Sequence, residues 1–255
     1  MIRHATHGPW GDGSLHLPYE ELERGLAALT PPKDAGTLAL IVARGDDGRR
    51  STPERAVLTP AGGVPGDAWG RDSPEKAEAQ LTLMRVDVAR LFANGQPLSL
   101  FGDNLLVDLD LSVANLPTGS RLRVGAALLE VTPKPHDGCL KFRQRVGQDA
   151  LRLTADRRLD LRLRGIYAKV VEGGEVALGD PIEVASRGGA RPPASRPLRV
   201  GVSGDALDPP LRSLAHERFQ VPVVAPELDP SLPHLRARQP LGIRSMLDAP
   251  LFREG

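Results

Sequence analysis

The stretch that decides the fold covers residues 121–131 and reads RLRVGAALLEV. Charged Arg121 and Arg123 alternate with apolar neighbours, and this period of two predicts a strand with one buried face. The apolar run at residues 128–131 predicts that the strand continues across Gly125. Prolines at positions 133 and 135 end it, because proline cannot donate a hydrogen bond to a sheet.

Shorter segments of the same character lie on both sides of this strand. The other ranges that we predict as strands are residues 37–44, 55–59, 80–85, 98–109 with a break at Gly102, 166–171 and 176–184. Paired glycines in residues 172–175 predict a hairpin between the last two. Apolar residues at helical spacing predict helices at residues 18–29 and 87–92. Many short strands with regular turns indicate a β-barrel or sandwich, so we predict a mainly β (α+β) fold with a few peripheral helices.

The chain changes character after residue 184. Residues 190–255 hold 11 of the 24 prolines, which disfavours long strands or helices there. One helix is predicted to begin at Asp208, with Pro209 in its first turn. We predict a barrel domain at residues 15–187 and a proline-rich C-terminal arm at residues 188–255. Composition leaves open whether this arm packs on the domain or on a partner, or is disordered.

Bulk composition narrows the classes of function. The formal net charge is +1 and aromatic residues make up 4% of the chain, so neither property indicates nucleic-acid binding. No apolar run reaches the roughly 20 residues that a bilayer crossing needs. Residues 1–13 lack the apolar core of a signal peptide. We therefore expect a cytoplasmic protein with no membrane partner.

The single cysteine, Cys139, lies in the segment KPHDGCLKFRQR at residues 134–145. One cysteine excludes an internal disulfide and a cysteine-only zinc site. The surrounding basic residues favour the thiolate, which is both a nucleophile and a soft metal ligand. His136 and Asp137 are candidates for proton delivery. Two other interpretations stay open here, because a lone cysteine is often an inert apolar residue and a basic run is often only a solvated surface.

Several segments, taken in order, resemble the MOSC domain family, which is named after the C-terminal part of molybdenum cofactor sulfurase. They are residues 63–69 (GVPGDAW), 80–84 (QLTLM), 102–105 (GDNL), 116–125 (LPTGSRLRVG), 129–132 (LEVT), 136–142 (HDGCLKF), 164–170 (RGIYAKV) and 179–180 (GD). The resemblance covers residues 15–185. Its specificity lies in the order and spacing of the segments and in the placement of the cysteine.

This resemblance implies a MOSC-type β-barrel in which Cys139 is the sulfur carrier or the molybdenum ligand. Some relatives bind molybdenum cofactor (molybdopterin) and reduce N-hydroxylated compounds. Others accept sulfur from a cysteine desulfurase that uses pyridoxal phosphate. We expect no pyridoxal phosphate on this chain, because it lacks a desulfurase domain, so that cofactor would act on a separate partner.

The same resemblance suggests which residues contact the cofactor. Asp67 and Asn104 are expected there because they lie in matching motifs. The remaining candidates are chosen by charge for an anionic partner and are Lys134, Lys141 and Arg145. The chain departs from many family members at Ala68 and Trp69, which replace a basic residue and a histidine after the Gly-Asp pair.

Three hypotheses of function follow. The first is a molybdenum-cofactor-dependent oxidoreductase that reduces N-hydroxylated or N-oxygenated small molecules and receives electrons from a donor protein. The second is a sulfurtransferase-like carrier that holds a Cys139 persulfide delivered by a cysteine desulfurase. The third is a non-catalytic binding module in which Cys139 only packs and the arm docks a partner. Slow alkylation of Cys139 in native protein would favour the third, since a packed thiol is shielded.

Overall fold

The computed structural model describes residues 8–45, 48–69, 77–157 and 160–188, together with the backbone of residues 201–203 and 234–236. The chain divides into two units, Met1–Arg191 and Pro192–Gly255. In the second unit, β12 (Gly201–Ser203) pairs in parallel with β13 (His234–Arg236). The helix predicted after Asp208 lies outside the described residues. The proline-rich arm and its boundary at residue 188 stay predictions.

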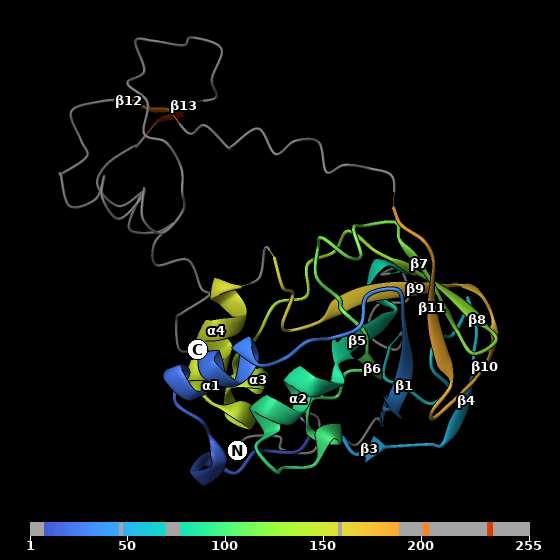
Figure 1. Ribbon diagram of the computed structural model, residues 1–255, viewed down its shortest axis with the longest axis horizontal. Coiled ribbons are helices and arrows are strands. Elements are labelled where there is room, and N and C mark those ends of the chain that lie inside the picture. The colour runs from blue at the N-terminus through green and yellow to red at the C-terminus, as the bar shows by residue number, and fades with distance from the viewer. Residues whose placement is uncertain are drawn as a thin grey trace. The chain divides into compact units, whose positions relative to one another are not determined.

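A closed barrel of seven strands forms the centre of the first unit (Figure 1). Around the ring the strands are β1 (Ala35–Ile41), β11 (Pro181–Ser186), β7 (Arg121–Val124), β8 (Ala127–Val131), β9 (Ile166–Glu172), β5 (Leu81–Arg85) and β6 (Leu105–Asp108). β6 pairs with β1 to close the ring. β5 and β6 run parallel, whereas the other neighbours in the ring are antiparallel. The predicted mainly β fold with a barrel is therefore confirmed.

Apolar side chains that alternate along the strands fill the barrel. In β9, buried Ile166, Ala168 and Val170 alternate with more exposed residues, as expected for a strand with one face on the core. They form one core with Leu38 of β1 and Leu122 of β7. The period of two that was read from the sequence thus separates the inner face of the barrel from its outer face.

β5 differs from β9 because all of its residues are buried. Leu81 and Leu83 belong to the barrel core, while Met84 belongs to a second core beneath the helices. The helices are α1 (Tyr19–Ala27), α2 (Val86–Ala93), α3 (Leu140–Val146) and α4 (Gln148–Asp156). The helices predicted at residues 18–29 and 87–92 are confirmed as α1 and α2. Helices α3 and α4, which follow the cysteine, had not been predicted.

Short elements complete the first unit. They are the 3₁₀ helices Gly13–Leu15, Ala77–Ala79 and Leu98–Leu100, and the strands β2 (Ala43–Arg44), β3 (Arg50–Ser51), β4 (Arg55–Leu58) and β10 (Gly174–Ala177). Outside the ring, β2 pairs with β3 and β4 pairs with β10. The β2–β3 pair holds Arg44 and Arg50 opposite each other, close to the end of β1.

Two strand predictions are wrong in their pairing. Residues 121–131 form a hairpin of β7 and β8 rather than one strand, because Gly125 has a φ of +51° and turns the chain. The expected hairpin of residues 166–184 does not form, since β10 pairs with β4 while β9 pairs with β8 and β5. At Gly174 a Cβ would lie 2.5 Å from the Ala126 backbone. The paired glycines therefore allow a close approach to the β7–β8 turn instead of closing a hairpin.

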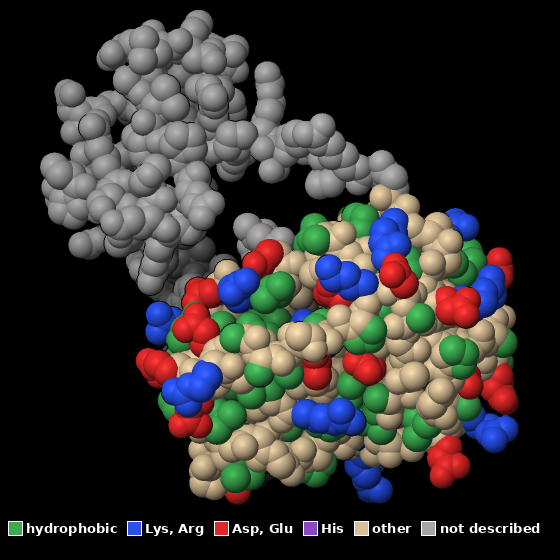
Figure 2. All heavy atoms as spheres, in the orientation of Figure 1, with side chains coloured by type: hydrophobic (Ala, Val, Ile, Leu, Met, Phe, Trp, Pro, Cys, Tyr) green, Lys and Arg blue, Asp and Glu red, His purple; other side chains and the backbone are tan. Residues whose placement is uncertain are grey.

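Acidic and basic side chains are interspersed over the face of the first unit that Figure 2 shows. This mixture agrees with the net charge of +1 and gives that face no single-sign field of the kind that attracts nucleic acid. In the described ranges, no helix combines the length and the apolar character that a membrane crossing requires. The expected cytoplasmic location stays a prediction.

Candidate functional site

Cys139 lies at the N-terminal end of α3 and is exposed. Its backbone is extended, with φ −138° and ψ 176°, and its carbonyl accepts the first helical hydrogen bond from Arg143 N at 3.0 Å. The thiol makes no capping bond, and the neighbouring Leu140 is also exposed. The side chain is open to a reactant or a ligand, which does not support the interpretation of Cys139 as a packed residue, and the hypothesis of a non-catalytic binding module stays a prediction.

Residues 101–103, which we call the site floor, connect the 3₁₀ helix Leu98–Leu100 to β6. Arg145 of α3 donates from Nη1 to the Phe101 carbonyl at 2.8 Å. Gly102 has a φ of +73°, and a Cβ there would lie 2.9 Å from Arg50 Nε. Only glycine fits this position without strain, so Gly102 lets the Arg50 guanidinium lie directly against the floor.

Two basic side chains, Arg164 and His136, lie against the carboxylate of Asp103, the last residue of the site floor. Arg164 donates from Nη1 to both carboxylate oxygens at 2.8 and 2.7 Å. His136 Nδ1 lies 3.7 Å from Asp103 Oδ1. The side chains of Asp103 and Arg164 are only 1% and 10% exposed. Such a buried, charge-assisted pair fixes the guanidinium in position, and the Arg164 Cζ atom also lies 5.0 Å from the centre of the Phe142 ring.

His136 is neutral at pH 7. Burial lowers its pKa well below the usual 6.5, and the charges of Arg164, Arg44 and Lys134 lower it further. The Asp103 carboxylate would favour the charged imidazole, but Arg164 already neutralises it through two hydrogen bonds. The His136 ring also packs against the Tyr167 ring at 4.5 Å between centroids, which keeps water away from one face of the imidazole.

Buried polar atoms without a hydrogen bond are concentrated at this site. Across the described residues, the buried side-chain nitrogen and oxygen atoms that lack a partner are Arg50 Nε, His136 Nδ1 and Arg164 Nε. All three nitrogens belong to the side chains around the site floor, and we call these three residues the donor cluster. A buried polar group without a partner is costly and uncommon in a folded protein. The donor cluster is therefore the part of the described chain where buried side-chain nitrogens have hydrogen-bonding capacity that the protein itself does not use.

The charge of the site is positive. The pKa of Arg145 is lowered to about 10, because it is buried and feels the charges of Arg50 and Arg164. Cys139 and Asp103 act in the opposite direction on the same group. Burial is the main cause of this shift, and the charges of the neighbouring Arg50 and Arg164 add repulsion to it. An anionic ligand would relieve this repulsion.

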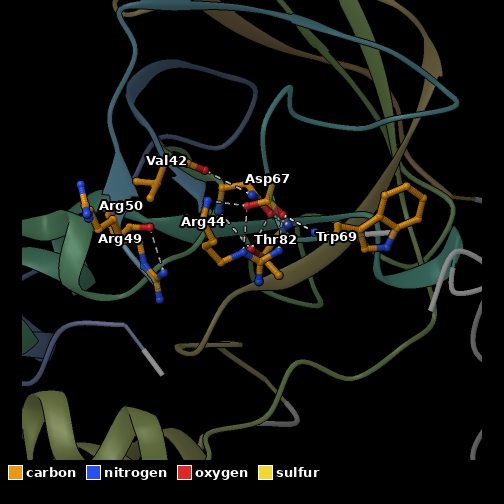
Figure 3. A network of polar contacts seen from close by, with 8 residues as sticks. Val42, Arg44, Arg49, Arg50, Asp67, Trp69 and Thr82 are labelled. Atoms are coloured by element: carbon orange, nitrogen blue, oxygen red, sulfur yellow. Dashed lines mark hydrogen bonds and ion pairs between the residues drawn. The ribbon is translucent and has the colours of Figure 1, made fainter. Parts of the chain in front are cut away.

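Asp67 belongs to a second group of buried polar residues. Its carboxylate accepts from Arg44 N, Nε and Nη2 at 2.8, 2.9 and 2.6 Å, and from Trp69 N at 2.9 Å (Figure 3). Burial alone would raise the pKa of Asp67, but the hydrogen bonds and charge of Arg44 lower it. Trp69, where many family members carry a histidine, thus contributes its backbone N–H to this network. The side chain of Asp67 is 1% exposed and fully hydrogen-bonded.

Asn104 links the same network to the barrel. Its Oδ1 accepts from Thr82 N and Thr82 Oγ1, both at 3.1 Å, and its Nδ2 donates to the Val42 carbonyl at 3.2 Å. These bonds join β5 and β6 to the chain between β1 and β2. We call Arg44, Asp67, Thr82 and Asn104 the scaffold network. The cofactor contacts expected of Asp67 and Asn104 stay predictions, and the contacts observed for both residues are structural.

The remaining predicted residues differ in their distance from the site floor. Lys134 Nζ lies 5.2 Å from the centre of the Tyr167 ring, which places it beside His136. Asp137 is half-buried in the same loop, and Lys141 is exposed on α3. The structure therefore places Lys134 beside His136 at the Tyr167 ring and Arg145 near Cys139, and their catalytic or binding roles stay predictions.

Arg50, Asp103, Arg164 and Tyr167 were missed as site residues. Three of them lie in segments that carried the family resemblance, GDNL at residues 102–105 and RGIYAKV at residues 164–170. Their place in those motifs was the available signal. Arg50 gave no such signal, because it reaches the floor only through the β2–β3 pairing.

Comparison with known proteins identifies the class of this fold. Residues 76–183 match the MOSC domain family, so the chain contains a MOSC domain. The family resemblance predicted from the sequence is confirmed. No curated protein matches the chain.

Three bacterial proteins are among the solved structures to which the chain is similar. YiiM from Escherichia coli has a TM-score of 0.42 and 22% identity, over 60% of this chain and 71% of its own. The YuaD protein from Bacillus subtilis has a TM-score of 0.44 and 20% identity, over 58% of this chain and 94% of its own. YiiM from Geobacillus stearothermophilus has a TM-score of 0.43 and 16% identity, over 61% of this chain and 77% of its own.

Proposed function

We propose that this MOSC protein binds molybdenum cofactor through Cys139 and reduces N-hydroxylated or N-oxygenated small molecules. The observation that carries the proposal is the donor cluster beside an exposed thiol. Arg50 Nε, His136 Nδ1 and Arg164 Nε are buried without hydrogen bonds, and the buried Arg145, bonded to the Phe101 carbonyl, adds a further positive charge at the site floor. An anionic group with several acceptor oxygens matches the two arginine nitrogens, and His136 Nδ1 donates to it in the tautomer that carries the Nδ1 hydrogen.

The residues present fit such a cofactor. No group of three or more histidine, cysteine, aspartate or glutamate side chains that could hold a metal ion occurs among the described residues. Cys139 would therefore be the ligand from the described part of the chain, and a pterin dithiolene brings the other sulfur ligands with it. When bound, molybdenum cofactor supplies a two-electron redox centre. Arg50, Arg164 and Arg145 would hold its anionic portion.

His136 and Asp103 suit proton handling in this reaction. A neutral imidazole must take up a proton before it can deliver one. Asp103 Oδ1 lies 3.7 Å from His136 Nδ1 and would orient the ring for this uptake, while Arg164 balances most of the charge of this carboxylate. Arg164 fixes the Asp103 carboxylate in turn. In this scheme His136 moves the proton, and Asp103 and Arg164 act as positioning residues.

A persulfide carrier is the second candidate, and the exposure of Cys139 favours it over a binding module with a packed cysteine. A desulfurase can transfer sulfur only to a thiol that its own active-site cysteine can reach. This function predicts cyanide-releasable sulfur on the wild type after incubation with a cysteine desulfurase, and none on Cys139→Ala. Metal-free protein that carries such sulfur would replace the first proposal with the second.

The test of the first proposal is the molybdenum content of the purified protein. Wild type and Cys139→Ala are produced in a host that makes molybdenum cofactor, and metal per protein is measured by elemental mass spectrometry. Near-stoichiometric molybdenum in the wild type and its loss in the variant support Cys139 as the ligand. Equal molybdenum in both would contradict it, and so would reduction of N-hydroxylated bases by protein without cofactor.

A further inference from the structure

A cavity of about 370 Å³ lies behind the loop that carries His136. The loop residues 132–136 form one wall, residues 162–166 form another, and Thr154 of α4 and Val113 close it. Its volume is within the range of small-molecule sites. Cys139 does not line it, so the cavity extends away from the thiol.

The charged groups that line the cavity are all basic. They are Lys134, Arg162 and Arg164, with His136 as a neutral imidazole beside them, and none of the described lining residues is acidic. Arg164 is paired with Asp103, which lies outside the lining. The cavity therefore has a positive potential that its own walls do not compensate.

Arg162 is the lining residue best suited to bind an anion. Its Nη1 donates to the Leu116 carbonyl at 2.6 Å, and its side chain makes no ion pair with any described residue. The residue is half-buried, and this burial lowers the pKa of Arg162. An arginine of this kind commonly binds a carboxylate or phosphate, because the planar guanidinium matches two oxygens at once.

The rest of the lining is apolar. Leu163 and Ile166 are buried and Val113 is half-buried, and prolines 133 and 135 lie in the opposite wall. These side chains suit a small apolar body rather than a second charged group. The lining thus combines one cationic region with one apolar region.

The cavity also reaches the candidate site. His136 and Arg164 line it and belong to the donor cluster on the site floor. A molecule in the cavity would therefore contact the same imidazole that handles the proton in the proposed reaction. Because His136 and Arg164 belong both to the cavity and to the candidate site, the cavity is suited to hold a substrate of that site.

We propose that this cavity selects the substrate, and that the substrate carries an oxyanion, a carboxylate or a phosphate, on a small apolar body. Arg162 and Lys134 hold the oxyanion, and Val113, Leu163 and Ile166 contact the apolar body. The role as a substrate pocket rests on the proposed function. The preference for an anion rests on the lining alone and is measured without turnover.

The test is calorimetric titration of the purified full chain at neutral pH and about 150 mM salt. The probes are benzoate, phenyl phosphate, neutral benzamide and cationic benzamidine. We expect benzoate or phenyl phosphate to bind at least about tenfold more tightly than benzamide. The tighter of the two anions identifies the oxyanion that the cavity prefers.

Three variants locate the binding. Arg162→Gln is expected to weaken anion binding about tenfold, since it removes a charged hydrogen-bond donor. Lys134→Gln is expected to weaken it less, because lysine contributes only a point charge. Val113→Phe fills the cavity and is expected to weaken binding without any change of charge. Arg152→Gln is the matched control, because Arg152 lies on α4 with a side chain 63% exposed and does not line the cavity.

Several results would overturn the proposal. One is that benzamide or benzamidine binds as tightly as both anions. Another is that Arg162→Gln and Arg152→Gln weaken anion binding equally, or that Val113→Phe leaves it unchanged in folded protein. Molybdenum is measured on the same samples. Absent anion binding with molybdenum present refutes the cavity proposal alone. Anion binding without molybdenum refutes the proposed function and the role as its substrate pocket, but not the preference of the cavity for an anion.

Discussion

The scaffold network and the donor cluster are neighbouring groups of buried polar residues, and they differ in how completely they are hydrogen-bonded. In the scaffold network, the carboxylate of Asp67 accepts four hydrogen bonds from Arg44 and Trp69. In the donor cluster, Arg50, His136 and Arg164 each have a buried nitrogen with no partner. Complete pairing indicates a structural role, and unpaired buried donors indicate a binding site.

Asp103 and Asn104 show how sharply the two groups divide. The two residues are adjacent in sequence and almost fully buried, with exposed fractions of 1% and 0%. Asn104 joins the scaffold network through Thr82 and Val42, whereas Asp103 holds Arg164 and lies beside His136. One motif, GDNL, thus supplies a residue to the barrel and a residue to the site.

The largest expected effect is the loss of stability in Asn104→Ala. This change leaves the Thr82 N–H and the Val42 carbonyl buried without their partner, and each unpaired group costs about 1–3 kcal/mol. We expect urea unfolding to show a loss of about 4 kcal/mol. Gln144→Ala, an exposed change on α3, should stay within about 0.5 kcal/mol. Equal effects of the two variants would contradict the structural role of Asn104.

Arg44→Gln is expected to have a somewhat smaller effect. It leaves the Asp67 carboxylate, 1% exposed, with only backbone donors, and breaking a buried ion pair costs about 3 kcal/mol. The control is Arg55→Gln, whose partner Glu175 is 3.6 Å away in an exposed pair that contributes less than about 0.5 kcal/mol. The free energy of unfolding, measured in urea, separates the two. A loss no greater in Arg44→Gln than in the control would show that the buried pair does not stabilise the fold.

The pH dependence of stability tests the environment of His136. Its pKa is lowered in the folded state, so above the ordinary imidazole pKa of about 6.5 both states are neutral there. Below that pH, His136 is protonated in the unfolded chain but stays neutral in the folded chain. The free energy of unfolding therefore falls by about 1.4 kcal/mol for each unit by which the pH is lowered. This part of the slope should be absent in His136→Gln, as measured by urea unfolding between about pH 7.5 and 5.5. Parallel curves for the two proteins would mean that His136 is not held neutral.

The smallest effect on stability is expected for Cys139→Ala. The thiol is exposed and makes no capping bond, so the urea midpoint should not change. Iodoacetamide should alkylate the wild-type thiol as fast in native protein as in unfolded protein. A thiol that reacts only after unfolding would restore the interpretation of Cys139 as a packed residue.

Local pattern predicted the barrel but not the pairing of its strands. The ranges 80–85 and 166–171 are close to β5 and β9 because a period of two is a property of each strand alone. The hairpin across Gly125 was missed because the apolar run continued through the turn. Helices α3 and α4 were missed because basic residues dominate α3 and a glycine with φ +97° separates the two.

The candidate site was only partly predictable for a related reason. Cys139, His136 and Lys134 share one segment, so the sequence could group them. Arg50 and Asp103 reach the same site through barrel closure and the β2–β3 pair, which join residues distant in sequence. Asp67 and Asn104 matched family motifs, but only the contacts distinguish a residue that supports a site from one that binds a ligand.

The most direct test of the comparison is the molybdenum content and urea midpoint of Arg50→Gln and Arg44→Gln. Both changes remove one positive charge from the β2–β3 pair, but Arg50 has a buried nitrogen without a partner and Arg44 is paired with Asp67. We predict that Arg50→Gln loses most of its molybdenum and keeps its urea midpoint, while Arg44→Gln is less stable and keeps its molybdenum. Loss of molybdenum only in folded Arg44→Gln would contradict the assignment of unpaired donors to the site.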